Sequence, residues 1–251
     1  MTWETYHQLI WAWILLGLVT FVYLLYKKAP FGRHTRPGWG PTLPNAWGWV
    51  IMEFSLIPSF LLPIWQSDRP VSPVICFMVG LFMLHYLHRS LVYPAFLHTR
   101  GKRMPLIIVL SAITFNAVNG TFFGTWFGTF ADYDASWWQD GRFLFGLLLF
   151  LVGAAINVRS DYQLIALRKG SETGYTIPYG GFFRWVSCPN HFGEMLEWSG
   201  YALLTWSLPG LAFAFWTIAN VLPRSLAHHA WYREHFPDYP AGRKAVFPGV
   251  L

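Results

Sequence analysis

Charged residues are scarce in this sequence, because Asp, Glu, Lys and Arg together make up only 12% of its 251 residues. Soluble domains carry about 25%. Hydrophobic residues account for 54% and aromatic residues for 20%, and the mean hydropathy is positive. This composition argues against a soluble domain and predicts an integral membrane protein.

Cysteines are also rare, since the chain has only two, Cys76 and Cys188. Cys76 falls inside an apolar run and Cys188 on the expected inner side, where thiols stay reduced, so we expect no disulfide. The sequence further lacks a Walker A motif and any Gly-x-Gly-x-x-Gly that follows a strand. A P-loop and a Rossmann domain are therefore excluded, and a nucleotide would have to bind to membrane helices and their inner loops.

Apolar runs long enough to cross a bilayer, about 17–25 residues each, recur along the chain. We predict seven transmembrane helices in a single all-α membrane domain, residues 1–251. The runs are Leu9–Tyr26, Ala46–Trp65, Val74–Tyr93, Pro105–Phe127, Phe143–Val158, Phe192–Leu208 and Leu211–Leu226. No basic residue precedes the first run, so we expect it to remain in the mature protein rather than to act as a signal peptide.

Basic residues indicate the orientation. With the N-terminus outside and the C-terminus in the cytosol, only Arg69 and Arg142 of the 18 Lys and Arg lie outside, which leaves 16 inside. The net charge of +6 is spread over loops beside the apolar runs. This pattern suits lipid headgroups and a phosphate-bearing cofactor that faces the cytosol, not nucleic acid. We expect a multi-pass protein, in the inner membrane if it is bacterial.

Polar residues concentrate late in the chain at helical spacing. Two series at i, i+4, i+7 and i+11 would each line one helix face. They are Asn157, Asp161, Leu164 and Arg168, and Asn190, Glu194, Glu197 and Tyr201. Between them, residues 174–181 are rich in Gly and Pro and suit a turn whose backbone N–H groups approach a ligand. This region is predicted to form a polar-cofactor site.

Glu53 lies in the middle of the second apolar run, where a carboxyl group costs a few kcal/mol. A structural ion pair is one explanation, but an ionisable residue at this depth usually has a function. Near the end of the third run, Phe82, Tyr86, Arg89 and Tyr93 share one helix face. Glu53 and Tyr86 are therefore candidates for a proton donor and its hydrogen-bond partner in an apolar cavity.

Several blocks of the chain match one known family in order and spacing. They are Gly32–Thr35, His85–Tyr93, Asn157–Tyr162, Leu167–Lys169, Tyr175–Gly181, Asn190–Glu194, Glu197–Trp198, Arg224–Tyr232 and Asp238–Lys244. Together they resemble the steroid 5α-reductase family (3-oxo-5α-steroid 4-dehydrogenase), in a bacterial type of member. The resemblance runs from about Gly32 to Leu251 and is strongest after Asn157.

The resemblance implies NADPH-dependent reduction of the Δ4 C=C bond of a 3-oxosteroid. It implies Glu53 and Tyr86 as catalytic residues, and residues 1–130 as the substrate and proton-donor side, with most of the NADPH site in residues 131–251. The implied NADPH contacts are Arg33, Asn157, Asp161, Arg168, Tyr175, Asn190, Glu194, Arg224, His228, Tyr232 and Arg243. The implied substrate contacts are Trp49, Arg89, Phe115, Trp198, Phe213 and Trp216.

The sequence departs from the family pattern at a few positions. Ser55–Ile57 behave as an insertion after Glu53, Met52 and Asn220 replace residues typical of animal members, and Ser111 stands where an Arg is expected. The insertion affects the local helix geometry, Ser111 removes one expected phosphate contact, and Asn220 affects the shape of the substrate pocket. The substrate is therefore a steroid or another lipid enone, and we expect the protein to act as a monomer in contact with membrane lipid.

Alternatives from other classes remain open. The runner-up is a membrane methyltransferase of the isoprenylcysteine or phospholipid type that uses S-adenosylmethionine, but such an enzyme needs no Glu53 and Tyr86 pair. A heptahelical receptor or retinal protein is disfavoured because the last two runs contain no Lys for a Schiff base. A di-iron site would need clustered His boxes, and most of the nine His are scattered, so no metal is expected.

Overall fold

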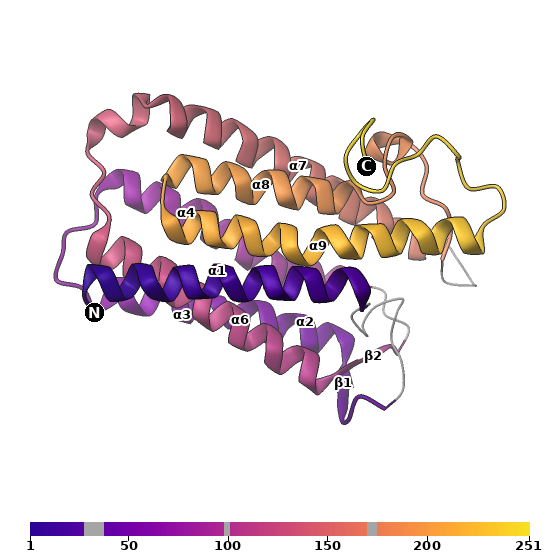
Figure 1. Cartoon of the computed structure of the whole chain (residues 1–251), viewed down its shortest axis with the longest axis horizontal. Helices are drawn as coiled ribbons and strands as arrows, with labels where there is room; N and C mark the ends of the chain where they lie inside the picture. Colours follow the sequence, from indigo (N-terminus) through magenta and orange to yellow (C-terminus); the bar gives the residue numbers. More distant parts are fainter. Residues whose placement is uncertain (28–37, 98–100, 170–174) are drawn as a thin grey trace. The chain divides into compact units, whose positions relative to one another are not determined.

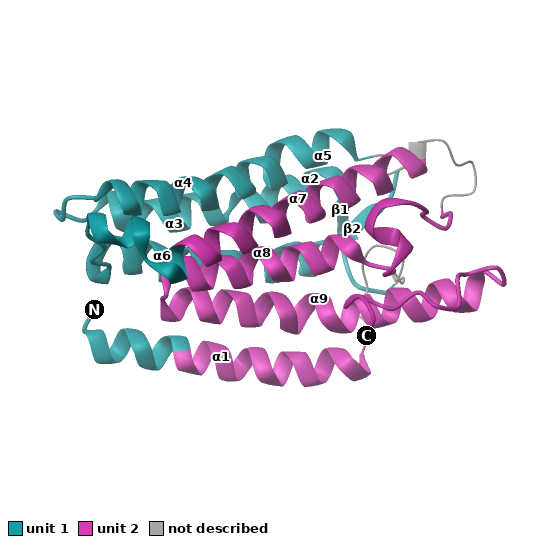
Figure 2. Ribbon diagram, turned by 90° about the horizontal axis from the view of Figure 1, so that it is seen from above, with its two compact units in different colours: residues 1–10, 30–143 teal, residues 11–29, 144–251 magenta. Residues whose placement is uncertain are grey.

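The computed structural model in Figure 1 describes residues 1–27, 38–97, 101–169 and 175–251. Arg33, one of the predicted cofactor residues, lies outside these ranges. The chain divides into two compact units (Figure 2): residues 1–10 with 30–143, and residues 11–29 with 144–251. The long first helix, α1 (Trp3–Tyr26), contributes to both units.

Five helical segments of the described chain are long and apolar enough to cross a membrane. They are Trp3–Tyr26, Asn45–Trp65, Pro73–Phe96, Leu106–Phe130 and Gly141–Arg168. They correspond to the first five predicted runs, so a mostly helical membrane protein is confirmed. The sixth and seventh runs do form helices, α8 (Pro189–Thr205) and α9 (Leu208–His235), but neither is among these five. The count of seven spans and the orientation stay predictions.

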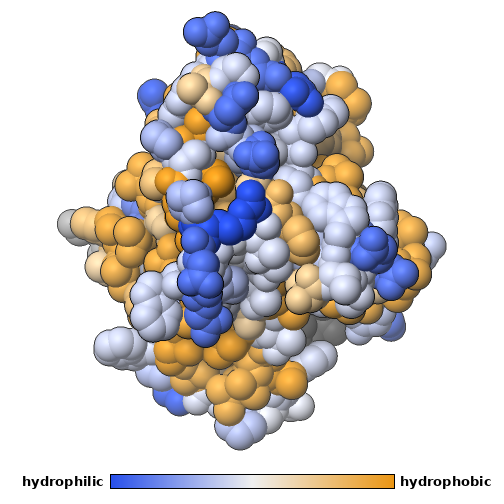
Figure 3. Space-filling model, turned by 90° about the vertical axis from the view of Figure 1, so that its left-hand side faces the viewer, coloured by the Kyte–Doolittle hydropathy of each residue, from blue (hydrophilic) through white to orange (hydrophobic). Residues whose placement is uncertain are grey.

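Apolar side chains also cover the outside of the helices. On α7 (Gly141–Lys169), Leu144, Phe145, Leu148 and Leu151 are each more than half exposed. Such a continuous apolar stripe would be costly in water and is stable against lipid tails. In the space-filling view, hydrophobic side chains (orange) lie on the surface beside hydrophilic ones (blue) (Figure 3).

The first unit is built from short and long helices and one small sheet. Its elements are β1 (Thr42–Pro44), α2 (Asn45–Phe54), α3 (Leu56–Trp65), α4 (Pro73–Leu87), the π-helix η2 (His88–Val92), α5 (Tyr93–Phe96), β2 (Arg103–Pro105), α6 (Leu106–Thr125), the π-helix η3 (Trp126–Phe130) and the 3₁₀ helix η4 (Ala135–Gln139).

The small sheet aligns two helices of this unit. β1 pairs antiparallel with β2, with Leu43 opposite Met104, and each strand runs directly into a helix. α2 and α6 therefore both start from this sheet. Further along, the Asn116 side chain of α6 donates a hydrogen bond to the Met52 carbonyl of α2 at 2.6 Å, so these helices remain in contact beside Glu53.

The predicted second span is interrupted at Ser55, where α2 gives way to α3. The Ser55 hydroxyl donates to the Met52 carbonyl at 2.7 Å, and the Ser55 backbone stays in the right-handed helical region. Pro58 has no N–H to donate to Phe54, which removes one helical hydrogen bond just after the break. The three residues Ser55–Ile57 that look inserted in the sequence thus lie at this junction.

The second unit contains α7, the 3₁₀ turn η5 (Gly181–Arg184), α8, α9 and the C-terminal tail. Two of its helices are longer than the apolar runs that predicted them. α7 continues from the membrane segment to Lys169, and α9 continues past Leu226 to His235. The first predicted polar face, from Asn157 to Arg168, therefore continues an apolar helix rather than forming a separate element, and the second, from Asn190 to Tyr201, lies on α8.

α7 and α8 approach each other through four glycines, which we call the glycine seam: Gly146 and Gly153 of α7, and Gly193 and Gly200 of α8. A Cβ atom on Gly153 would meet the Glu197 backbone nitrogen and lie 2.6 Å from the Gly193 carbonyl oxygen. Equivalent clashes arise at the other three positions, all with backbone atoms. Only glycine permits this distance between two helix backbones.

The C-terminal tail returns to the start of α8. Backbone hydrogen bonds run from Lys244 N to Trp185 O at 3.0 Å, from Ser187 N to Lys244 O at 2.8 Å, and from Cys188 N to Ala245 O at 3.0 Å. Because the tail is hydrogen-bonded here, the neighbouring Arg243 is held inside the second unit and only 4% of it is exposed.

Candidate functional site

An amide and carboxylate network joins α7 to α8 on the polar faces predicted from the sequence. The Asn157 side chain donates to the Asn190 carbonyl at 2.9 Å, and the Asn190 side chain donates to Asp161 Oδ1 at 2.9 Å. Asn157 and Asp161 are buried. Short amide side chains reach across only because the glycine seam, at Gly153 and Gly193, brings the helices together. Buried networks of this kind hold their members in one geometry.

Arg243 is a charged residue that is buried in the second unit. Its guanidinium lies over the rings of Tyr239, at 4.9 Å, and Tyr179, at 5.6 Å, and Nη1 donates to the Tyr239 hydroxyl at 3.3 Å. Its Nε is buried and has no hydrogen-bond partner within the described residues. Burying a charged donor without an acceptor is costly, so this position suits an anionic ligand that would accept its hydrogen bond.

Ser187 connects the tail to α9. Its hydroxyl lies 2.6 Å from His229 Nδ1, 2.6 Å from the Tyr239 hydroxyl and 3.1 Å from the Lys244 carbonyl. Tyr239 in turn accepts from Arg243. The predicted anion contact is therefore fixed in place by three residues for which the sequence analysis assigned no role.

The environment of this cluster changes two pKa values. The pKa of His229 is lowered, first because burial disfavours the charged ring and then because Arg233, Arg243 and Lys244 are nearby cations. The pKa of Tyr239 is raised, mainly because burial disfavours the phenolate. Both groups are thus kept neutral, and the positive charge of the cluster is on Arg243.

A second group of predicted cofactor residues gathers around the end of α7. Arg168 lies over the ring of Tyr175 at 5.9 Å, and Tyr175 packs edge-on against Trp231 at 5.3 Å. Tyr232, on the same turn of α9 as Trp231, is buried and stacks on Tyr239 at 5.2 Å. Residues 175–180 form no helix, as their Gly and Pro content predicted. The structure thus brings Arg168 and Tyr175 together.

Three further predicted cofactor residues lie on α8 and α9. Glu194 belongs to α8, and Arg224 and His228 belong to α9. All three are partly buried. Ten of the predicted cofactor residues are described, and every one belongs to the second unit.

Tyr86 lies in the last turn of α4 in the first unit. Its side chain is buried and stacks on Phe82, with ring centroids 5.1 Å apart, and its carbonyl accepts from the Ser90 hydroxyl at 2.6 Å. The π-helix His88–Val92 follows immediately. Such a bulge shifts the helical register and is frequent at functional sites.

Arg89 and Trp49, two of the predicted substrate contacts, are brought together in the first unit. The Arg89 guanidinium lies 5.0 Å from the Trp49 ring and 4.8 Å from the Tyr93 ring. Glu53 is partly buried one turn beyond Trp49 on α2, and Phe115 is partly buried on α6 beside the Asn116 that binds α2. Glu53 and Tyr86 belong to the same unit, and their pairing stays a prediction.

The remaining predicted substrate residues are aromatic side chains of the second unit. Trp198 and Phe213 pack edge-on with ring centroids 4.7 Å apart, and both are buried. Trp216 donates from its indole nitrogen to the Trp13 carbonyl at 3.0 Å and packs on the Trp13 ring at 4.8 Å. Trp216 therefore also serves to hold α1 against α9.

The glycine seam was not predicted, although the sequence carries a signal for it. Gly146 and Gly153 are seven residues apart, as are Gly193 and Gly200, which places each pair on one helix face. The contacts of Ser187, His229 and Tyr239 had no comparable signal, because they join three segments that are distant in sequence.

Comparison with known proteins gives a consistent result. A sequence model of the family 3-oxo-5-alpha-steroid 4-dehydrogenase matches residues 102–251. Steroid 5-alpha-reductase DET2 of Gossypium hirsutum is 39% identical over 98% of this chain and 97% of its own length. 3-oxo-5-alpha-steroid 4-dehydrogenase 1 of Bos taurus is 41% identical over 94% and 93%, and 3-oxo-5-alpha-steroid 4-dehydrogenase 2 of Homo sapiens is 42% identical over 95% and 96%.

The mostly helical membrane fold and these matches together define a membrane-embedded oxidoreductase. The chain belongs to the 3-oxo-5-alpha-steroid 4-dehydrogenase family. The resemblance stated from the sequence is thereby confirmed.

Proposed function

We propose that this protein uses NADPH to reduce the Δ4 C=C bond of 3-oxosteroids. Family membership supports the reaction. The observation that supports the cofactor most directly is the buried Arg243, whose Nε lacks a hydrogen-bond partner within the described chain and so suits a phosphate oxygen. NADPH, when bound, supplies the hydride.

The second unit supplies both kinds of contact that a dinucleotide phosphate needs. Arg243 and Arg168 carry positive charge for its phosphates, and each guanidinium is kept in place by a tyrosine ring. Asn157, Asn190 and Asp161 offer amide and carboxylate groups that suit its hydroxyl and amide groups. Glu194, Arg224, His228 and Tyr232 complete the proposed set.

The first unit would supply the proton chemistry. Hydride addition to the β carbon of the enone places negative charge on the 3-oxo oxygen. The Tyr86 hydroxyl would donate to that oxygen, and Glu53 would hydrogen-bond to the hydroxyl and orient it. Burial of Tyr86 strengthens such a bond because water is excluded. Trp49, Arg89 and Phe115 would line the apolar substrate site.

We expect the purified protein to convert a Δ4-3-oxosteroid to its 5α-reduced product with NADPH, and much more slowly with NADH. The extra 2′-phosphate of NADPH gives Arg243 and Arg168 a charged partner that NADH lacks. Product analysis by mass spectrometry under both cofactors measures this. Equal affinities for NADH and NADPH would contradict the 2′-phosphate contact. A rise in melting temperature with S-adenosylmethionine but not NADPH would favour the methyltransferase alternative.

Replacing Arg243 by Gln should weaken NADPH binding by about 1–3 kcal/mol, which is roughly a 5- to 150-fold rise in Kd. The substitution keeps a side chain that hydrogen-bonds but removes the charge. The matched control is Arg233→Gln, because Arg233 is exposed on α9, so its loss should leave the Kd near the wild-type value. Fluorescence titration of NADPH measures both. An unchanged Kd for Arg243→Gln would remove Arg243 from the cofactor site.

A further inference from the structure

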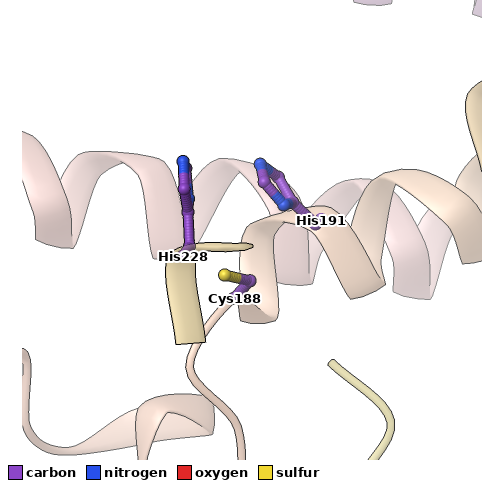
Figure 4. A group of neighbouring side chains, drawn as sticks. All are labelled: Cys188, His191 and His228. Atoms are coloured by element: carbon purple, nitrogen blue, oxygen red, sulfur yellow. The ribbon is translucent and has the colours of Figure 1, made fainter. Parts of the chain in front are cut away.

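A cysteine and two histidines meet where α8 begins beside α9 (Figure 4). Cys188 is the residue that caps the N-terminus of α8, His191 lies in the first turn of the same helix, and His228 comes from α9. One donor atom of each residue lies within 4.8 Å of those of the other two. Cys188 and His191 are buried, whereas His228 is partly exposed. The three side chains thus form a mostly closed group with one accessible side.

A hydrogen bond from Ser225 orients His191. The Ser225 hydroxyl donates its proton to the Val221 carbonyl at 2.6 Å, so toward His191 Nδ1, at 2.8 Å, its oxygen acts as the acceptor. The ring is thus held through Nδ1, and Nε2 is the nitrogen that would ligate an ion. Histidines that bind metals are commonly oriented by a hydrogen bond at the other ring nitrogen.

Cys188 is buried at the N-terminus of α8, a 17-residue helix. Its sulfur lies 3.9 Å from the Ser225 carbonyl, a distance at which any S–H hydrogen bond is weak. Ser225 thus contacts two of the three residues and fixes their relative position.

We propose that Cys188, His191 and His228 bind a thiophilic divalent cation such as Zn²⁺. Thiolate and imidazole are the ligands that this ion prefers, at about 2.3 Å for sulfur and about 2.0–2.1 Å for nitrogen. Tetrahedral ligands at these lengths lie roughly 3.5 Å apart, so small side-chain rotations would close the group around an ion. Three protein ligands leave a fourth position for water on the accessible side of His228.

A bound ion would also oppose cofactor binding, an effect that rests on the proposed function. His228 belongs to the proposed NADPH contacts, and His191 directly follows Asn190 in the amide network. If His228 ligates the ion, it no longer serves the cofactor. Because linkage is reciprocal, NADPH should weaken metal binding by the same factor as the metal weakens NADPH binding.

Titration of the purified protein with Co²⁺, a spectroscopic substitute for Zn²⁺, tests the site without any cofactor. Thiolate ligation produces a sulfur-to-cobalt charge-transfer absorption, which should appear in the wild-type protein at about one ion per chain and disappear when Zn²⁺ is added. Cys188→Ser should abolish the absorption. The matched control is Cys76→Ser, which removes the other, exposed cysteine and should leave the absorption unchanged. Ser225→Ala should raise the metal Kd by about 10- to 100-fold.

X-ray absorption spectroscopy of the zinc-loaded wild-type protein tests the site without any variant. We expect it to show zinc bound by one sulfur and two imidazole nitrogens. Absence of the charge-transfer absorption, or its loss in Cys76→Ser instead of Cys188→Ser, would overturn the site.

A separate titration of NADPH with and without Zn²⁺ tests the linkage, which an unchanged NADPH Kd would overturn. Failure of NADPH to bind at all would disprove the proposed function and leave the metal site standing.

Discussion

Replacing Tyr86 by Phe is expected to lower kcat for a Δ4-3-oxosteroid by a factor of about 10²–10⁴, the usual effect of losing a general acid. The change deletes the hydroxyl and keeps the ring, so the stacking on Phe82 and the buried packing remain. NADPH affinity should be unchanged, because every described cofactor candidate belongs to the other compact unit. Steady-state kinetics together with NADPH titration separate the two effects.

Two further variants complete the test of Tyr86: one changes its proposed partner, and the other is a control. Glu53→Gln keeps the size of the side chain but removes the carboxylate, so it should also lower kcat and change its pH profile if Glu53 orients the Tyr86 hydroxyl. Tyr23→Phe is the control, because Tyr23 is exposed on α1 and should have no effect on turnover. Near-normal turnover of Tyr86→Phe would mean that the proton comes from another residue or from water.

Replacing Gly153 by Ala is expected to destabilise the protein by about 3 kcal/mol, the upper part of the range for overpacking. The new methyl group would meet the Glu197 backbone nitrogen and the Gly193 carbonyl oxygen, and backbone cannot move aside as a flexible side chain can. α7 and α8 would have to separate. The bonds that Asn190 makes with Asn157 and Asp161 span the same interface, so NADPH affinity should fall together with the melting temperature.

Gly80→Ala is the matched control for the seam. Gly80 also lies inside a helix, α4, but nothing stands within 4 Å of a Cβ at that position. Alanine favours helix over glycine by about 0.5–1 kcal/mol, so this variant should be neutral or slightly more stable. If Gly153→Ala matched Gly80→Ala in melting temperature and NADPH affinity, the close approach of α7 and α8 would not be needed for the site.

The proposed metal site differs from the sequence-based expectation that no metal binds, which stays untested. Scattered His residues argued against metal when they were judged by their spacing in the sequence. His228 is separated from Cys188 and His191 by all the rest of α8 and most of α9, so spacing carries no sign of their meeting. Only the antiparallel pairing of the two helices brings the three side chains together.

Local patterns were enough to predict the helices and the polar face of each. Apolar runs identified α1, the α2–α3 segment, α4, α6 and α7, because burial in lipid depends on composition along a single stretch of chain. The i, i+4 spacing of Asn157 and Asp161 placed both on one face of α7, since side-chain direction in a helix follows from its period alone. The sequence blocks that match the family identified the enzyme class.

Tertiary structure alone decided which faces meet and how closely. Nothing in the sequence states that Asn190 binds both Asn157 and Asp161, or that the tail buries Arg243 beneath Tyr239. Such contacts depend on the rotation, shift and separation of whole helices, which arise from the sum of many packing interactions. The glycine seam shows the difference: its spacing is visible in the sequence, but the backbone contact that excludes a single methyl group exists only once α7 and α8 have packed.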